Sequence, residues 1–455
     1  MNNRLGSRTV SLNARCAAVA ISLALLTGCA SYGVVKNTPV TASTPDHAYA
    51  LQRWAGSANR PREFAFVLTF SGGGTRAAAM AYGVLEELRD TKVMVNGKQT
   101  RLLDEITHIS SVSGGSFTSA YYGLHGEGIF DTYEDVFLRV DVEGALTRSL
   151  FNPFHWFGKT GRTERAIKYY EKNIFHNSTI GDMMQPGRPM IIINGSDLSA
   201  GVRFSFTQEY FSFLCSDAAE FPVARAVAAS SAVPVLFNPV VVENYAGCPE
   251  FKWPANAEQM AQQNAEFAML YNGLRTYNDK SARKYIHFVD GGITDNMGLR
   301  AMHDVVAMAG GNEAFIKKVN PQIPRRLVLI SVNASTEKLS TMDESTKQPS
   351  MLESLNAMTD VQLHRYNADT LELVQSQLTN WANSLSTPER PVTPYMIQVT
   401  FEQVPQPNLR AFLNKIPTSF SLTDEEVDTL ISSARSLLRN DPTFKQLLAD
   451  LAAGN

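Results

Sequence analysis

The sequence has almost no net charge, and this shortage already excludes one class of partner. Its 41 Lys and Arg residues nearly balance 44 Asp and Glu residues, so the formal charge of the 455-residue chain is −3. This balance argues against nucleic acid as a partner and provides no general attraction to anionic lipid headgroups. With 44% hydrophobic and 19% charged residues, the composition is that of an ordinary globular protein with a large core. No internal repeat or low-complexity tract is visible.

The amino terminus lacks a hydrophobic run long enough to cross a membrane. Three arginines precede an apolar stretch at residues 17–26, whereas a spanning helix needs about 20 apolar residues. This pattern predicts a secretory signal over residues 1–28. The sequence LTGC at residues 26–29 resembles the lipobox of bacterial lipoproteins. The resemblance implies that Cys29 becomes the acylated first residue, and Ala30 after it favours the outer membrane of the bacterial cell envelope.

Cysteine is scarce, with four residues in the chain. Cys16 would be lost with the signal, and Cys29 would carry the lipid. The remaining two, Cys215 and Cys248, form an even pair in an oxidising compartment. We therefore expect a disulfide between them.

A serine followed by two glycines stands at the end of a strand-like run. Residues 109–116 read ISSVSGGS, which places Ser113, Gly114 and Gly115 between a predicted strand and a predicted helix. A serine on such a tight turn adopts torsions that few residues tolerate, and the glycines allow a substrate carbonyl to approach. The pattern is typical of a nucleophile elbow, although Ser111 replaces the first glycine of G-x-S-x-G. An ordinary Ser-Gly turn is the alternative.

Three consecutive glycines, Gly72, Gly73 and Gly74, separate another strand-like run from a helix-like segment. Backbone N–H groups at the start of a helix bind anions, such as a phosphate or the oxyanion of acyl transfer. We favour such a nest over a flexible connection, because three glycines cost more backbone entropy than one turn needs. Arg76 in the first helical turn opposes the macrodipole, which a salt bridge with a carboxylate or a nearby anion would explain.

A third strand-like run ends in a carboxylate flanked by glycines. Residues 288–292 read FVDGG, so Asp290 is followed directly by Gly291 and Gly292. An Asp-Gly-Gly sequence alone is most often a turn. It gains weight here because it is the third strand end of this kind, after those at Gly72 and Ser113.

These three segments together resemble the patatin-like phospholipase family, over roughly residues 64–299. The resemblance implies a serine lipid acyl hydrolase of phospholipase A or lysophospholipase type that acts on a phospholipid or another acyl lipid without cofactor or metal. It implies that Ser113 is the nucleophile and Asp290 the base, with an oxyanion hole at the triple glycine. Ala77 replaces the last glycine of the family's loop, and it is also small. The residues with supporting roles would be Arg76, Gly114, Gly115, Gly291 and Gly292.

A carboxylate with a reference pKa near 4 is a weak base for a serine hydroxyl. Desolvation would raise that pKa, and each oxyanion donor typically contributes about 3–4 kcal/mol. A Ser-His-Asp triad is the competing scheme. Among the histidines only His287 lies near a motif. If its segment is a strand, His287 and Asp290 point to opposite faces, which makes His287 a poor relay.

Strand-like runs alternate with helical stretches along the chain. This alternation predicts a three-layer α/β fold in which helices flank a mostly parallel sheet. In such sheets ligands bind at the carboxyl ends of strands, where all three motifs fall. The strand-like runs are residues 64–70, 106–112, 190–194, 285–289, 327–332 and 395–401.

The predicted organisation divides the chain into a signal, a tether, a catalytic domain and a C-terminal α/β extension packed on that domain. The polar stretch inside the catalytic domain would be an insertion, either a lid or a solvated surface helix. The respective ranges are 1–28, 29–60, 61–335 with the insertion at about 244–283, and 336–455.

Two helices are predicted in the extension. Residues 351–378 form the longer one, and TDEE at 423–426 is a capping box before an apolar stripe. The polar face of this second helix is acidic, so the stripe is expected to face the core rather than lipid.

Two other functions remain open. Nucleotide binding at the glycine turn is disfavoured, because Gly-Lys-Ser/Thr is missing and Ser113 stands where a ribose-binding acid would be expected. The second is a catalytically silent lipoprotein that binds lipid or a partner.

Overall fold

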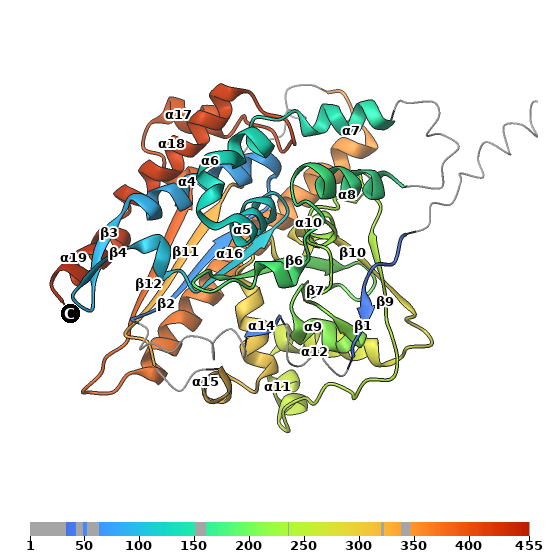
Figure 1. Ribbon diagram of the computed structural model, residues 1–455, viewed down its shortest axis with the longest axis horizontal. Coiled ribbons are helices and arrows are strands. Elements are labelled where there is room, and N and C mark those ends of the chain that lie inside the picture. The colour runs from blue at the N-terminus through green and yellow to red at the C-terminus, as the bar shows by residue number, and fades with distance from the viewer. Residues whose placement is uncertain are drawn as a thin grey trace, which may run out of the picture.

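A computed structural model describes residues 33–41, 49–51, 63–150, 161–234, 236–319, 323–337 and 346–454. The predicted signal, Cys29 and most of the predicted tether lie outside these ranges. Within them, the chain forms one eight-stranded sheet with helices on both faces (Figure 1). The predicted helix-flanked α/β fold is therefore confirmed.

The sheet is parallel on one side and antiparallel on the other. Five parallel strands lie in the order β12 (Thr393–Thr400), β11 (Arg326–Asn333), β2 (Phe64–Phe70), β5 (His108–Val112) and β6 (Met190–Asp197). Beyond them, β10 (Tyr285–Asp290) and β7 (Val202–Ser205) pair antiparallel with β6, and β9 (Val240–Glu243) pairs antiparallel with β10. The strand that carries Asp290 therefore runs against its neighbour, which the alternation of strands and helices did not reveal.

The register explains how an antiparallel strand still delivers its carboxylate to the expected edge. Asp290 lies opposite Gly195 in β6, and Val112 at the end of β5 lies opposite Asn194. The carboxyl ends of β10 and β5 therefore lie at the same level of the sheet. Strand β10 reaches this level from the opposite direction, because it starts beyond the carboxyl end of β6. Ser113, which follows Val112, comes to the same level as Asp290.

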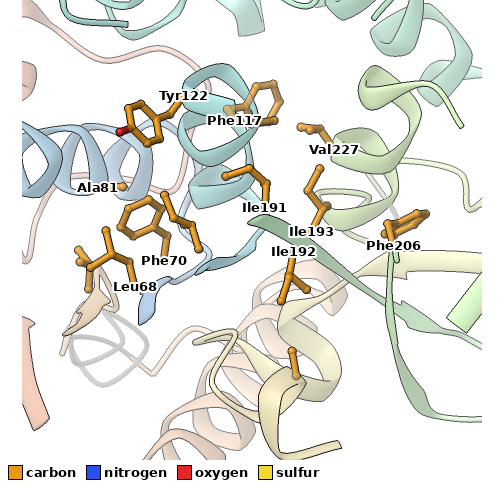
Figure 2. Close-up of a cluster of buried hydrophobic side chains, with 14 of the residues drawn as sticks. Leu68, Phe70, Ala81, Phe117, Tyr122, Ile191, Ile192, Ile193, Phe206 and Val227 are labelled. Carbon is orange, nitrogen blue, oxygen red and sulfur yellow. The ribbon is translucent and has the colours of Figure 1, made fainter. Parts of the chain in front are cut away.

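Strand β2 shows why this chain forms a layered sheet. Alternate side chains of a strand point to opposite faces, and Leu68 and Phe70 pack in the core beside Ala81 of α4 (Gly74–Asp90) (Figure 2). Val67 packs in the other direction, with Leu329 and with α16 (Met351–Leu385). Figure 1 shows α4 and α16 on opposite sides of the strands.

Strand β6 lies at the centre of the molecule, and all of its residues are buried. Ile191 and Ile193 point to one side of the strand and Ile192 to the other (Figure 2). A strand covered on both faces reads as a continuous apolar run rather than an alternating pattern. That is the run MIII that the sequence shows at residues 190–193.

The insertion contains one packed helix and one largely exposed helix. Helix α12 (Ala265–Arg275) buries Phe267 and Leu274, and Glu266 at its start bridges two arginines. A carboxylate oxygen of Glu266 lies 2.7 Å from Arg203 and 2.6 Å from Arg300. A disulfide between Cys215 and Cys248 fastens the beginning of the same segment to the domain. The alternative of a solvated surface helix fits α11 (Ala257–Gln263), in which only Ala257 is buried, but does not fit α12.

The C-terminal extension lengthens the sheet through β12 and covers it with α18 (Asp424–Asn440). Thr423 and Glu426 form the predicted capping box at the start of α18. The apolar stripe is buried against α4, so closely that a Cβ on Gly83 would lie 2.6 Å from the carbonyl oxygen of Ile431. The prediction that this stripe belongs to the core is confirmed.

The other helices and strands are short and surround this frame. No helix in the described ranges is long and apolar enough to cross a membrane. The remaining strands are β1 (Thr38–Pro39), β3 (Lys92–Val95), β4 (Lys98–Arg101) and β8 (Ser216–Asp217). The remaining helices are α5 (Gly114–His125), α6 (Ile129–Tyr133), α7 (Val142–Leu150), α8 (Arg162–Asn173), α9 (Gln208–Phe211), α10 (Val223–Ser230), α13 (Gly292–Asp295), α14 (Arg300–Met308), α15 (Asn312–Val319), α17 (Pro407–Leu413) and α19 (Pro442–Ala452).

Candidate active site

Ser113 occupies the sharp turn between β5 and α5, with φ 50° and ψ −122°. A non-glycine residue in this region costs about 1–3 kcal/mol and persists only where its surroundings hold it. The N–H of Ser113 donates to Oγ of Ser230 at 2.8 Å, and Ser230 donates in turn to the carbonyl of Asn194 at 2.6 Å. The turn is thereby fastened to α10 and β6, and Ser113 is only 6% exposed.

The two glycines after Ser113 are needed for packing inside the protein. A Cβ on Gly114 would lie 2.0 Å from the carbonyl oxygen of Gly74, and one on Gly115 would lie 2.7 Å from Cβ of Phe70. The sequence argument assigned these glycines to the approach of a substrate. The structure shows that they let the start of α5 touch the glycine turn directly.

Replacing Gly114 by alanine is expected to disrupt the site. Because the new Cβ would meet backbone atoms of Gly74, the turn or α5 must shift, and the free energy of unfolding should fall by about 1–3 kcal/mol. The matched control is Gly128→Ala, whose Cβ would meet only Cβ of His125 at 3.7 Å. Thermal unfolding and ester hydrolysis should both change in Gly114→Ala and stay near wild type in Gly128→Ala. Equal behaviour of the two variants would contradict the close contact.

The glycine turn presents unpaired backbone donors beside Ser113. Gly73 and Gly74 have φ values of 140° and 62°, which favour glycine. Within the described ranges, the N–H groups of Gly73, Gly74 and Gly114 have no acceptor from the protein. Such N–H groups at the starts of α4 and α5 suit an oxyanion.

Gly72 does not act as the sequence predicted. Its N–H donates to the carbonyl of Asn296 at 3.0 Å, so it has no free donor for an oxyanion. A Cβ on Gly72 would lie 2.7 Å from Oδ1 of Asn296 and 3.3 Å from Cβ of Ser113. The missing side chain at Gly72 therefore allows the turn to lie against the serine.

Arg76 holds the wall of the site. Its guanidinium donates to the carbonyl oxygens of Ala334 at 2.9 Å and Ile416 at 2.6 Å, and to Oγ1 of Thr418 at 3.0 Å. The next residue in the extension, Ser419, accepts the N–H of Thr75 at 2.9 Å. These bonds join the glycine turn to the C-terminal extension.

Asp290 is a buried carboxylate with few partners. Oδ1 accepts the N–H of Gly292 at 2.7 Å, and the hydroxyl of Ser113 lies near enough to the carboxylate to lower its pKa. Burial raises the pKa of Asp290 from 3.8 to about 6, and Gly292 and Ser113 limit the rise. Asp290 is therefore ionised at neutral pH but is a stronger base than an exposed aspartate.

Gly291 and Gly292 let the chain turn sharply beneath this carboxylate. A Cβ on Gly291 would lie 2.4 Å from the carbonyl oxygen of Asn194, and one on Gly292 would lie 2.9 Å from Oδ1 of Asp290. The N–H of Gly291 also donates to the carbonyl of Ser230 at 3.0 Å. Ser230 therefore fastens both the serine turn and the aspartate turn.

Histidine takes no part in this arrangement within the described ranges. His287 is exposed on β10, whereas Asp290 on the same strand is buried. Burial, Gly292 and Ser113 account for the pKa of Asp290, and no histidine contributes. The same part of the chain contains no cluster of three or more His, Cys, Asp or Glu side chains that could hold a metal ion.

Sequence reasoning missed three residues that shape the site, namely Asn194, Ser230 and Asn296. Asn194 donates to Oγ of Ser110 at 2.9 Å and accepts from Ser205 at 2.7 Å. For Asn194 the available signal was a polar side chain directly after the apolar run at residues 190–193 of a buried strand, because such a side chain needs a partner there.

A serine elbow, a buried aspartate and a glycine turn at one edge of an α/β sheet define the class of lipid acyl hydrolases that work through a serine. A model of the patatin-like phospholipase family matches residues 68–303, which is more than half of the chain. The chain belongs to the patatin-like phospholipase family. No curated protein matches the chain.

Solved structures with a similar fold include the human GIVD cytosolic phospholipase A2, which is 13% identical, with a TM-score of 0.42 over 92% of this chain and 66% of that one. The same human protein in complex with methyl gamma-linolenyl fluorophosphonate is 12% identical, with a TM-score of 0.39 over 91% of this chain and 64% of that one. VipD from Legionella pneumophila is 13% identical, with a TM-score of 0.27 over 83% of this chain and 67% of that one. This chain thus spans about two thirds of the length of the human protein.

Proposed function

We propose that this enzyme hydrolyses phospholipids or lysophospholipids through a Ser113–Asp290 dyad. The observation that carries the proposal is the buried carboxylate of Asp290, whose pKa is raised to about 6 by burial and lowered by the neighbouring Ser113 hydroxyl. A base whose pKa lies near the working pH is largely ionised and still accepts a proton from the serine hydroxyl readily. The family match supports an acyl lipid as substrate.

The reaction would proceed in two balanced halves. In the first, Ser113 Oγ attacks the ester carbonyl while Asp290 accepts its proton, and the proton then passes to the leaving alcohol as the C–O bond breaks. In the second, Asp290 takes a proton from water, whose oxygen attacks the acyl-serine. The released Ser113 oxygen recovers that proton and the fatty acid leaves.

The oxyanion of each intermediate needs donors, because a carboxylate base contributes no positive charge. The unpaired N–H groups of Gly73, Gly74 and Gly114 suit this role. Removing one such donor typically costs about 3–4 kcal/mol of transition-state stabilisation. The three N–H donors would therefore stabilise the transition state more than proton transfer to Asp290 does.

Product analysis tests the proposal. A mixed-lipid extract is incubated with wild type and with Ser113→Ala, and the products are identified by mass spectrometry. Fatty acid and lysolipid should appear only with wild type, and a fluorophosphonate should label Ser113. A folded wild-type protein that neither labels nor releases fatty acid would favour the alternative, an envelope lipoprotein that binds lipid or a partner without catalysis.

We also propose that the protein is anchored in the bacterial envelope, as an outer-membrane lipoprotein, through acylated Cys29. The support is the sequence alone: the short apolar run, the LTGC sequence and Ala30. The acyl chains on Cys29 would together give a strong anchor, since each buried methylene contributes about 0.8 kcal/mol.

In Cys29→Ser, labelling with radioactive palmitate is expected to fall to background, and the protein should leave the membrane fraction. Cys16→Ser, inside the predicted signal, is the matched control and should keep its label. Palmitate that remains on Cys29→Ser would contradict the anchor.

A further inference from the structure

A cavity lies on the face of the sheet opposite α4. Its volume is about 310 Å³, and it is walled by β2 and β11 on one side and by α14 and α16 on the other. Neither Ser113 nor Asp290 lines it. The volume falls at the lower end of the range for small-molecule sites, about 300–1,000 Å³. The cavity is therefore large enough for a ligand and separate from the candidate active site.

The cavity extends along two of its walls. Along β2 it is lined by Ala65, Val67 and Thr69, three residues on one face that together span about 13 Å. Along α16 it reaches from Val374 to Trp381, about 10 Å. Walls of this length accommodate an extended aliphatic segment.

Three buried polar atoms of this mostly apolar lining make no hydrogen bond to any described residue. They are the hydroxyl of Thr69, which is 1% exposed, Nδ1 of His303 and Nε1 of Trp381. Such a group costs about 1–3 kcal/mol when it stays unpaired. Thr69 lies at one end of the β2 wall, and Trp381 packs beside Ala65 at the other end, so a carboxyl or carbonyl group of a ligand would satisfy one of these donors.

The outer side of the cavity offers hydrogen bonds but no cation. Gln377, Asn380 and Asn312 lie there at least partly exposed, and no Lys, Arg, Asp or Glu is part of the lining. His303 is the one basic side chain of the lining, so a phosphate would meet no lysine or arginine there. Side-chain amides suit a carboxyl group, which accepts their N–H groups.

We propose that this cavity binds the aliphatic chain of a fatty acid at a site distinct from the active site. The inference goes beyond the proposed function, because binding requires neither Ser113 nor hydrolysis. The occupied cavity would join β2 to α16. A ligand there should therefore stabilise the folded protein in proportion to its concentration.

The test uses the full chain with Ser113→Ala, so that catalysis cannot affect the result. Brominated stearic acid quenches nearby tryptophan, and Trp381 lines the cavity. We expect saturable quenching that disappears in Trp381→Phe, while a rise in melting temperature with palmitate is retained there. Ala307→Leu and Ala65→Leu, which fill the cavity from α14 and β2, should each raise the Kd by at least about 10-fold, since room for two methylenes is lost.

The outcomes separate the possible ligands. Lysophosphatidylcholine of the same chain length should compete much more weakly than palmitate, because the cavity has no charged partner for its headgroup. Stronger competition by the lysolipid would overturn the assignment to a fatty acid. If both filled variants are folded by their melting curves and still bind palmitate with an unchanged Kd, the site itself is overturned. This result does not depend on which products the wild-type enzyme releases.

Discussion

Ser113→Ala should reduce ester hydrolysis by about 10,000-fold or more without unfolding the protein. The substitution removes the attacking oxygen, whereas the bonds that hold the turn come from the backbone N–H of Ser113 and from Ser230. Alanine can therefore occupy the same strained turn. Initial rates with a short-chain ester and fluorophosphonate labelling measure the loss, and the melting temperature reports on the fold.

The matched control for this result is Ser111→Ala, which lies in β5 two residues before Ser113. Its hydroxyl bonds to Oγ of Ser119 at 2.6 Å and lies outside the site. We expect a loss of about 1 kcal/mol in stability and nearly full activity. If Ser113→Ala retained a tenth of wild-type activity, another nucleophile would have to be sought.

Asp290→Asn should abolish hydrolysis and at the same time stabilise the protein at neutral pH. Because burial raises the pKa of Asp290 from 3.8 to about 6, the folded state carries a destabilising charge above that pH. Below about pH 4 the carboxyl group is protonated in both folded and unfolded states, so the penalty vanishes. Between pH 4 and 6 stability falls as pH rises, by about 3 kcal/mol in total for this shift.

The measurement is the melting temperature of wild type and Asp290→Asn from pH 4 to 8. The two curves should meet near pH 4, separate between pH 4 and 6, and stay apart above pH 6 with the asparagine variant higher. In wild type, kcat/KM should fall about tenfold per pH unit below pH 6, because the base must be ionised to accept the serine proton.

Asp304→Asn is a control of opposite sign. Asp304 is also buried, but it accepts two hydrogen bonds from Arg203 at 2.7 and 2.8 Å, and this charge lowers its pKa. Its loss should destabilise the protein at pH 7 by up to about 3–5 kcal/mol, because the buried arginine would keep Glu266 alone as a carboxylate partner. A destabilised Asp290→Asn that behaves like Asp304→Asn would contradict the proposed state of Asp290.

The sequence alone determined the fold class and the three motifs, because these depend on local chemistry. A strand fully covered on both faces needs a continuous apolar run, as at residues 190–193, and a sharp strand-to-helix turn needs small residues, as at Gly114. The capping box at Thr423 also follows from neighbours in the chain. Each of these features is a property of a few consecutive residues.

Only the tertiary structure decided which donors are free and which segments are fixed. Gly72 resembles its two neighbours in sequence, yet its N–H is occupied by Asn296. Likewise, Glu266 fastens helix α12 of a polar insertion to the domain because Arg203 and Arg300 converge on it. Hydrogen bonds and ion pairs between distant residues depend on the direction of strands and the packing of helices, and no short stretch of sequence contains that information.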